Sequence, residues 1–565
     1  MTIIGIDLGT TNSLVTCFKD GEPIVIPNVF GEYLTPSVVS VDENGEVFVG
    51  NIARERLLTH PQLTVSVFKR SIGSKKQYQL GQKTFTPEEL SAVIIGKLKE
   101  DAEEFLGEKI EEAIISVPAY FNDTQRRATK TAGELAGLKV ERIVNEPTAA
   151  AVAYGLHEKK DYTKYLVFDL GGGTFDISIL EKYNNIMEVR AVAGDNYLGG
   201  EDFTDILVSW FAKYHEIEEQ ELSLIDQGIL RKSAEMAKIS LGDARSTTMS
   251  CTLSGENYAM LVTIEEYEKK CELLFARLRN PIKRALSDAS ILLKDIDSIL
   301  LVGGATKLPL IKSFVTKLFG RFPPSHIDPD QVVAVGTAVH AALKERDQAI
   351  KEIVLTDVCP YTLGTNVVVY KPNGFYEAGH FFPIIERNSV IPISRSERLY
   401  TAHENQKNIT IEILQGESRR TEGNVHLGEL NIEVPQNRAG QEAVDVRYTY
   451  DINGILEVEV TVVSTGITKS MVLEKNPGTL TEKEIAEKLE ALKELKIHPR
   501  DKDENRFLLA KAERLYEEHV GEDRTFLSQE ILMFESLLDK QDEREIRDYA
   551  VRLGEIIKEF ENREL

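Results

Sequence analysis

The first 348 residues alternate short apolar, β-rich runs with segments of helical periodicity. One apolar run spans residues 113–118, a polar helical segment follows around 124–135, and a second apolar run occupies 140–144. Alternation of this kind is typical of α/β architecture, in which helices cover the faces of a sheet. The pattern therefore predicts an α/β domain over residues 1–348.

Polar and apolar residues alternate strictly in the next region, residues 358–477. The clearest examples are 409–413 and 455–462, and the second follows the dipeptide Asn453-Gly454. A period of two places successive side chains on opposite faces of a sheet, and Asn-Gly favours a tight hairpin turn. An antiparallel β-domain is therefore predicted here.

Helical periodicity returns over residues 478–565. Thr481 and Glu484 form a capping box near its start, and apolar residues recur at helical spacing from Ile546 to Phe560. Two interpretations fit this pattern equally well. The segment is either a bundle that packs on itself or a helical lid for the β-domain.

Residues 349–357 join the first two regions and contain neither Gly nor Pro. Ile353, Val354 and Leu355 make this segment apolar, although solvated linkers are normally polar. It is therefore either the last element of the α/β domain or a linker strand that docks on that domain and leaves it. The residues favour neither interpretation over the other.

Two stretches of the α/β region share one sequence pattern. Gly5–Ser13 and Val167–Asp176 each lead an apolar run into an aspartate and a turn rich in Gly and Thr, and a second apolar run follows each turn. This order predicts a strand, a tight turn and a strand in both copies. Their spacing is too long for one supersecondary unit and fits a duplicated domain with a cleft between two lobes.

Two such hairpins facing each other would hold a polyphosphate, because glycine lets backbone N–H groups approach phosphate oxygens and threonine adds hydroxyl donors. Asp7 and Asp169 would then face a hydrated metal ion, since carboxylates repel phosphate unless a cation lies between them. Residues 299–306 run into a third glycine turn, and a helix is predicted over 309–319. This turn adds a further surface of backbone donors.

Composition narrows the classes of partner. The chain has 565 residues, of which 42% are hydrophobic and 28% charged, and its formal net charge is −24. Such an acidic protein is not expected to bind nucleic acid non-specifically or an anionic membrane surface. No apolar run is long enough to span a membrane, and the first predicted strand begins at Thr2, which leaves no room for a leader peptide. The four cysteines are scattered and lack the spacing of metal ligands. These features predict a cytoplasmic protein with free thiols.

Further motifs complete a specific set, and with them the sequence resembles the seventy-kilodalton heat-shock chaperones, the DnaK family. The resemblance covers essentially the whole chain and rests on the two phosphate loops and on Val117–Asp123, Asn145–Ala151, Leu198–Phe203 and Leu301–Gly304. The short helical tail is most similar to the HscC subgroup. The family implies an actin-like, duplicated ribonuclease-H-like ATPase domain, an antiparallel β-sandwich for peptide and a short helical lid. It also implies ATP/ADP, Mg²⁺ and K⁺ as cofactors.

The resemblance implies a role for individual positions of the nucleotide site. The carboxylates that organise cations correspond to Asp7, Asp169, Asp176 and Asp330. The catalytic set corresponds to Lys69 and Glu146, which position the attacking water, with Asp7, Asp169 and Thr174. The nucleotide contacts correspond to Thr10, Thr11, Asn12, Gly171, Gly172, Gly173, Gly200, Glu201, Glu235, Lys238, Gly303, Gly304 and Lys307. This set suits phosphoryl transfer, where positioning and charge stabilisation do most of the catalysis.

Two more groups of residues follow from the resemblance. The interdomain signal is implied for Pro118, Arg126, Arg142, Leu355 and Asp357, with Arg142 and Asp357 facing a J-domain partner. The groove for an extended apolar peptide is implied for Leu399, Ala402, Ile409, Ile411 and Val444, although each of these residues also suits an ordinary β-core. The partners expected are unfolded clients and a J-domain protein, and the chain is expected to act as a monomer.

The sequence departs from the family at the residue expected to stack on the adenine base and in the length of two segments. Lys307 stands where the family has an adenine-stacking arginine, and the segments 73–87 and 246–263 are short, so a nucleotide exchange factor is not firmly implied. The same residues leave two alternative functions to consider, a small-molecule kinase and a filament or scaffold protein. A small-molecule kinase of actin-like fold would not need the β-domain, and Lys69 and Glu146 argue against a filament or scaffold without hydrolysis.

Overall fold

A computed structural model of the protein describes residues 2–155, 162–183, 186–324, 328–345, 354–370, 376–451, 456–473 and 498–563. The chain divides into two compact units, Met1–Pro360 and Tyr361–Leu565. The predicted boundaries at 348 and 477, linker residues 349–353, the Asn453-Gly454 turn and the Thr481/Glu484 capping box lie outside the described residues. The four-part division of the chain therefore stays a prediction.

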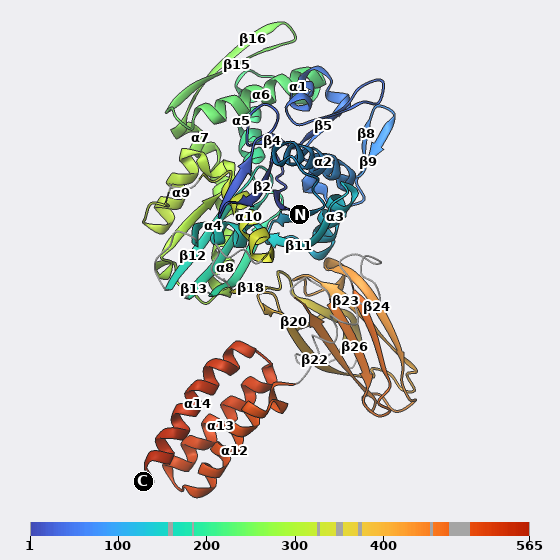
Figure 1. The fold of residues 1–565 in the computed structure, drawn as a ribbon. Coiled ribbons are helices and arrows are strands. Elements are labelled where there is room, and N and C mark those ends of the chain that lie inside the picture. Colours follow the sequence, from blue (N-terminus) through green and yellow to red (C-terminus); the bar gives the residue numbers. More distant parts are fainter. Residues whose placement is uncertain are drawn as a thin grey trace. The chain divides into compact units, whose positions relative to one another are not determined.

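The first unit contains two sheets of the same design (Figure 1). In the first sheet the order is β11-β10-β1-β2-β3, formed by Lys139–Asn145, Glu112–Val117, Ile3–Asp7, Asn12–Lys19 and Glu22–Ile26. In the second the order is β17-β12-β13-β14-β18, formed by Ser298–Val302, Tyr162–Leu170, Phe175–Tyr183, Ile186–Asp195 and Val354–Val358. Each sheet pairs its hairpin antiparallel and adds a parallel strand beside the first one. The duplicated α/β fold expected from the two copies is confirmed.

Helices cover these sheets, which explains why the strands read as nearly continuous apolar runs. In the first lobe, α10 (Val332–Glu345) packs on β1 and β2, and α2 (Pro87–Leu106) also packs on β2. In the second lobe, α8 (Glu272–Asp288) packs on β13 and β14. The sheets are thereby fixed, and their hairpin turns project from rigid strands.

The helix predicted over residues 309–319 is present with those bounds as α9 (Pro309–Phe319). Proline occupies its first turn, where no N–H partner is needed, and Gly320 ends it in the left-handed region with φ 67°. The polar helix predicted around 124–135 is α3 (Asp123–Leu135), and its first turn is capped by the Asn122 side chain. Local capping chemistry accounts for both elements.

The second unit contains two antiparallel four-stranded sheets. One has the order β20-β19-β23-β24, formed by Tyr376–Ile385, Leu363–Tyr370, Asn408–Gln415 and Val425–Glu433. The other has the order β22-β25-β26-β27, formed by Ile393–Tyr400, Ala443–Tyr450, Leu456–Val462 and Thr468–Leu473. The buried Tyr448 hydroxyl donates to the Gly364 carbonyl at 3.0 Å and links the two sheets. The antiparallel β-domain is confirmed.

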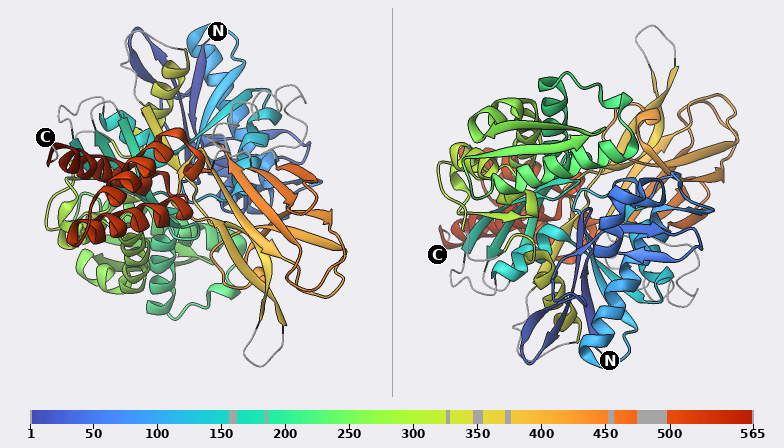
Figure 2. Two further views of the ribbon diagram at one scale, coloured as in Figure 1. Left: turned by 90° about the horizontal axis from the view of Figure 1, so that it is seen from below. Right: turned by 90° about the horizontal axis from the view of Figure 1, so that it is seen from above.

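Three helices follow, α12 (Asp503–Glu518), α13 (Glu522–Lys540) and α14 (Glu543–Arg563), and they lie side by side (Figures 1 and 2). Leu515, Leu527, Phe534 and Leu553 form part of their shared core. These helices therefore pack on one another, as the bundle interpretation predicts. Within the described part of the chain, none of the helices has the length and apolar character needed to cross a bilayer.

Candidate nucleotide site

A cavity of about 1260 Å³ lies in the first unit, between the β1–β2 and β12–β13 turns. All five predicted catalytic residues line it, and so does Asp330. The predicted nucleotide contacts line it as well, with the exception of Gly173. The predicted cation ligand Asp176 also lies outside the lining. Residues far apart in the sequence thus meet at one site.

The two phosphate loops touch at their glycines. A Cβ atom added to Gly172 would lie 2.3 Å from Thr11 Cγ2, and one added to Gly173 would lie 2.6 Å from Thr10 Cγ2. Both distances are far below van der Waals contact, so any larger residue would push the loops apart. Glycine is required here because threonine side chains of the first loop pack directly against the backbone of the second.

Two serines that the sequence analysis missed hold the first loop. Ser13 Oγ accepts from Gly9 N at 3.1 Å, and Ser37 Oγ donates to Gly9 O at 2.8 Å. The two hydroxyls also contact each other at 2.9 Å. Both serines are buried beside apolar strand positions, and a buried hydroxyl next to a glycine turn was the signal that could have identified them.

Lys69 and Glu146 form a buried ion pair with Nζ and Oε1 3.1 Å apart. Lys69 lies on the 3₁₀ turn η2 (Phe68–Ser71), and Glu146 begins α4 (Glu146–Gly155) at the end of β11. The turn is entered through Val67, whose φ of 59° is unusual for a β-branched residue. This backbone conformation directs η2, and with it Lys69, into the cavity.

Three carboxyl groups lie beside this pair: Asp169 and Asp176 are buried, and Asp7 is half-buried. Burial and the charge of Glu146 raise the pKa of Asp7 to about 7 and that of Asp176 to about 8. The same causes raise the pKa of Asp169 well above its ordinary value. Lys69 acts in the opposite direction on all three groups. The site thus concentrates negative charge that one lysine does not balance.

This charge fits a bound Mg²⁺. Asp169 Oδ2 and Asp176 Oδ2 are buried without a hydrogen-bond partner, and a hydrated cation would supply both charge and donors. No three His, Cys, Asp or Glu side chains in the described ranges converge closely enough to hold a metal by themselves. Mg²⁺ usually keeps several waters and binds one or two carboxylates together with phosphates, so this arrangement suits it.

The cavity lining also includes the residues implied for the nucleoside. Lys238 Nζ lies 2.6 Å from Glu235 Oε2 and donates to Gly200 O at 3.0 Å. Lys307 Nζ is held 2.8 Å from Asp328 Oδ1 and 2.5 Å from Asp330 Oδ2. Asp330, predicted as a cation ligand, is therefore ion-paired with Lys307 in this structure.

A chain of polar contacts leads from this site along the Pro118 segment. Tyr120 N donates to Asp176 Oδ1 at 3.1 Å. On either side of Tyr120, the carbonyls of Ala119 and Phe121 each accept from the Arg126 guanidinium at 3.0 Å. Arg126 is thus fixed by the backbone that directly follows Pro118.

The same chain continues to the linker strand. Arg126 Nη2 donates to Asn145 Oδ1 at 2.6 Å, and Asn145 Nδ2 donates to Asp357 Oδ2 at 2.5 Å. Arg142, for which a coupling to Asp357 was predicted, interacts with it electrostatically, while burial lowers the pKa of Arg142 from its ordinary value. Asn145 was not predicted as a member of this chain.

The end of the linker is a strand in this structure. β18 pairs parallel with β14, with Leu355 opposite Met187 and Thr356 opposite Glu188. It therefore joins the second-lobe sheet, as both interpretations of the segment allow. A single docked arrangement does not test whether the strand leaves, and that part stays a prediction.

The predicted peptide-groove residues differ in burial. Leu399 and Ala402 are half-buried and Ile409 is 8% exposed, whereas Ile411 and Val444 are 1% and 0% exposed. Leu399 and Val444 pair across β22 and β25, while Ile409 and Ile411 lie on β23 in the other sheet. Leu399 and Ala402 are accessible enough to touch a ligand without rearrangement, whereas Ile409, Ile411 and Val444 are buried.

Comparison with known proteins gives the family. A family model described as Hsp70 protein matches residues 3–80 and 75–564. The Chaperone protein DnaK of Thermosipho africanus is 40% identical over 527 residues, covering 91% of this chain and 86% of that protein. Neither match distinguishes the HscC subgroup, which stays a prediction. On the strength of both matches and of the fold, the chain belongs to the Hsp70 family.

Proposed function

We propose that this ATP-hydrolysing chaperone couples nucleotide turnover in its first unit to the binding and release of extended apolar segments of unfolded clients in its second. The observation that carries the proposal is the chain of contacts from Asp176, buried behind the cavity lining, to Asp357 on β18. Such a chain gives the nucleotide site a physical connection to the strand that leads into the β-domain.

The residues of the cleft suit hydrolysis of the terminal phosphate. Lys69 and Glu146, buried together, provide a cation beside the phosphate and an oriented carboxylate for the attacking water. Threonine hydroxyls and glycine N–H groups hold the phosphate chain in line. When bound, Mg²⁺ neutralises phosphate charge, and Asp7 and Asp169 are the residues that would hold it through water. We propose that K⁺ binds at the same site.

The partners proposed are an unfolded polypeptide at the β-sandwich and a J-domain protein near Arg142 and Asp357. We further propose that the protein acts as a monomer in the cytoplasm. Its four cysteines are all free in this structure, and the reducing cytoplasm would keep them so. A small-molecule kinase and a filament or scaffold are not favoured, because the family match extends through the β-domain and helices.

Peptide is expected to stimulate ATP hydrolysis. In single-turnover assays, an excess of an extended apolar peptide should raise the hydrolysis rate by at least about 5-fold, the lower end of ordinary allosteric coupling. A charged peptide of equal length serves as the control and should leave the rate unchanged. If the apolar peptide binds in an anisotropy assay and the rate does not move, the proposed coupling is wrong.

Ile409→Phe is expected to weaken peptide binding while sparing the fold. Ile409 is buried but keeps more exposed surface than Ile411 on the same strand, so we expect a larger side chain to reach into the proposed groove rather than the core. We expect peptide affinity to fall about 10-fold or more, corresponding to at least 1.4 kcal/mol, with the melting temperature within a few degrees of wild type.

Ile411→Phe is the matched control, two residues further along the same strand and 1% exposed. Overpacking a well-packed core costs about 1–3 kcal/mol, so this variant should lose stability clearly. If Ile409→Phe loses stability as much as Ile411→Phe and binds peptide normally, Ile409 belongs to the core and the groove lies elsewhere.

A further inference from the structure

The second phosphate loop turns its carbonyl oxygens away from the cavity. Gly171 O accepts from Gly200 N at 2.8 Å, and Gly172 O accepts from Glu201 N at 2.9 Å. Thr174 O accepts from Gly171 N at 3.1 Å, which closes the turn. Carbonyl oxygens repel phosphate and these are already bonded, as is Gly171 N, so the N–H groups available to an anion are those of later residues in the loop.

The fourth carbonyl of the loop is held differently. Gly173 O accepts from Arg70 Nε at 3.0 Å, so a side chain holds it where backbone N–H groups hold the other three. Arg70 follows Lys69 on η2 in the first lobe, whereas the loop belongs to the second. The orientation of this peptide group therefore depends on the two lobes lying together.

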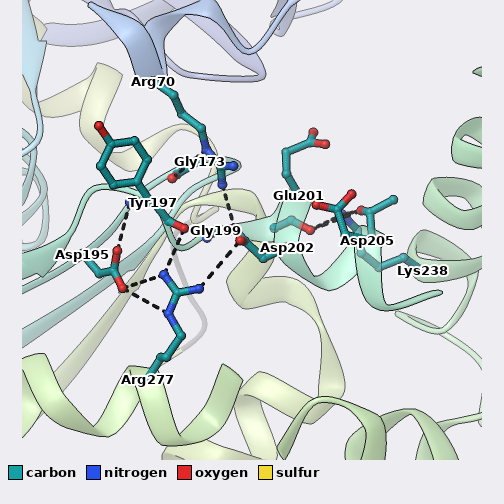
Figure 3. A network of polar contacts seen from close by, with 12 residues as sticks. Arg70, Gly173, Asp195, Tyr197, Gly199, Glu201, Asp202, Asp205, Lys238 and Arg277 are labelled. Carbon is teal, nitrogen blue, oxygen red and sulfur yellow. Dashed lines mark hydrogen bonds and ion pairs between the residues drawn. The ribbon is translucent and has the colours of Figure 1, made fainter. Parts of the chain in front are cut away.

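Arg70 is itself fixed by a carboxylate of the second lobe. Its Nη2 lies 2.7 Å from Asp202 Oδ2, and the two side chains are only 21% and 19% exposed. Asp202 Oδ2 also accepts from Gly199 N at 2.8 Å, at the start of α5 (Gly200–Tyr214). The guanidinium thus bridges a loop carbonyl and the first turn of α5 (Figure 3).

A second arginine approaches the same carboxylate from the opposite side (Figure 3). Arg277 lies 2.7 Å from Asp195 Oδ2 and donates to Tyr197 O at 3.1 Å, but its distance to Asp202 Oδ1 is 3.9 Å. None of these contacts reaches the phosphate loop. Arg277 therefore shares the charge environment of Arg70 without sharing its bond to Gly173.

Peptide geometry gives the Arg70 bond a consequence in the cavity. In a trans peptide the C=O of one residue and the N–H of the next point in opposite directions. Arg70 draws the Gly173 carbonyl toward itself, so the Thr174 N–H points away from Arg70. Thr174 lines the cavity and Gly173 does not, which agrees with that orientation.

We propose that Arg70 is a positioning residue that orients the Gly173–Thr174 peptide group toward the transferred phosphate when the lobes lie together. The proposal rests on the proposed ATP hydrolysis in this cleft. Arg70 acts on the reaction through the loop and needs no contact of its own with the phosphate. Lys69 and Arg70, adjacent on η2, would then place a charged group and a backbone donor in the site together.

Arg70→Met tests the proposal in the full-length protein. Removing an oriented donor outright costs about 100- to 1000-fold in turnover, and misorienting one should cost less. We expect single-turnover hydrolysis to fall about 10- to 100-fold while the Kd for ATP changes less than about 3-fold. Arg277→Met should keep hydrolysis within about 3-fold of wild type, since its contacts to Asp195 and Tyr197 leave Gly173 untouched.

Arg70→Lys separates orientation from charge. Lysine keeps the positive charge but lacks the fork that reaches Gly173 O and Asp202 together, so hydrolysis should stay clearly below wild type. Wild-type rates in Arg70→Met, full recovery in Arg70→Lys, or an equal loss in Arg277→Met would each overturn the proposal. An unmodified protein that does not hydrolyse ATP would instead refute the proposed function.

Discussion

Lys69→Ala is expected to lower single-turnover ATP hydrolysis by about two to three orders of magnitude and to leave ATP binding nearly intact. Lys69 is 4% exposed, and its ammonium group lies 3.1 Å from the Glu146 carboxylate, at the wall of the cavity. Phosphate contacts made by the two loops would survive the substitution, so affinity should change little. Rapid-quench hydrolysis and equilibrium ATP binding measure the two effects separately.

The substitution should also alter the pH profile. Lys69 lowers the pKa of Asp7, which lies at about 7, and that of Asp176, which lies at about 8. Without Lys69 both groups hold their protons to higher pH, and a protonated carboxyl no longer attracts a cation. The residual activity of the variant should therefore rise with pH over a higher range than wild type.

Lys164→Ala provides the control for a lost lysine. Lys164 lies on β12 in the same unit and pairs with Glu181 at 3.7 Å, near the surface and outside the cavity lining. Its removal should leave hydrolysis within experimental error, since neither Lys164 nor Glu181 lines the cavity. Wild-type turnover in Lys69→Ala would remove Lys69 from the catalytic set.

The parts of this protein that sequence predicted are those set by local chemistry. The repeated aspartate followed by a Gly/Thr turn predicted both hairpins, because such turns need glycine wherever they occur. Pro309 and Gly320 fixed the ends of α9 in the same way. Strict alternation identified the β-domain, since a shift of one residue would expose its core face.

What sequence could not predict are pairings between residues far apart in the chain. Nothing near Asn145 indicates that its amide contacts Asp357, and nothing near Arg70 indicates Asp202 or Gly173 as partners. The ion pairs of Lys307 with Asp328 and Asp330 likewise depend on how a turn and a later loop meet. Each of these contacts exists only after the lobes have assembled.

The contact between Asn145 and Asp357 is where nucleotide and peptide signals would meet. Asn145 directly precedes Glu146, the partner of Lys69, and receives Arg126 on its other side. A shift in the Pro118 segment would therefore reach Asp357 through three successive hydrogen bonds, by way of Arg126 and Asn145. The docking of β18 on β14 is the element whose stability that shift would change.

Leu355→Asp is expected to uncouple the two units. Leu355 stands opposite Met187 in the β14–β18 register, and aspartate is disfavoured in strands and adds charge at an apolar position. Ordinary allosteric coupling amounts to about 1–3 kcal/mol, so a charge placed on the docked strand should suffice to undock it. Basal ATP binding and peptide binding without nucleotide should remain.

Both directions of coupling should disappear together in Leu355→Asp, because coupling between two sites is reciprocal. Peptide should no longer accelerate hydrolysis, and ATP should no longer accelerate peptide release, while Leu355→Met should retain both effects by keeping an apolar side chain of similar size. Single-turnover hydrolysis and stopped-flow release of a labelled peptide measure the two directions independently. If either direction survives at full strength in Leu355→Asp, the linker is only a tether, and the signal must cross between the units by contacts other than the β18 strand.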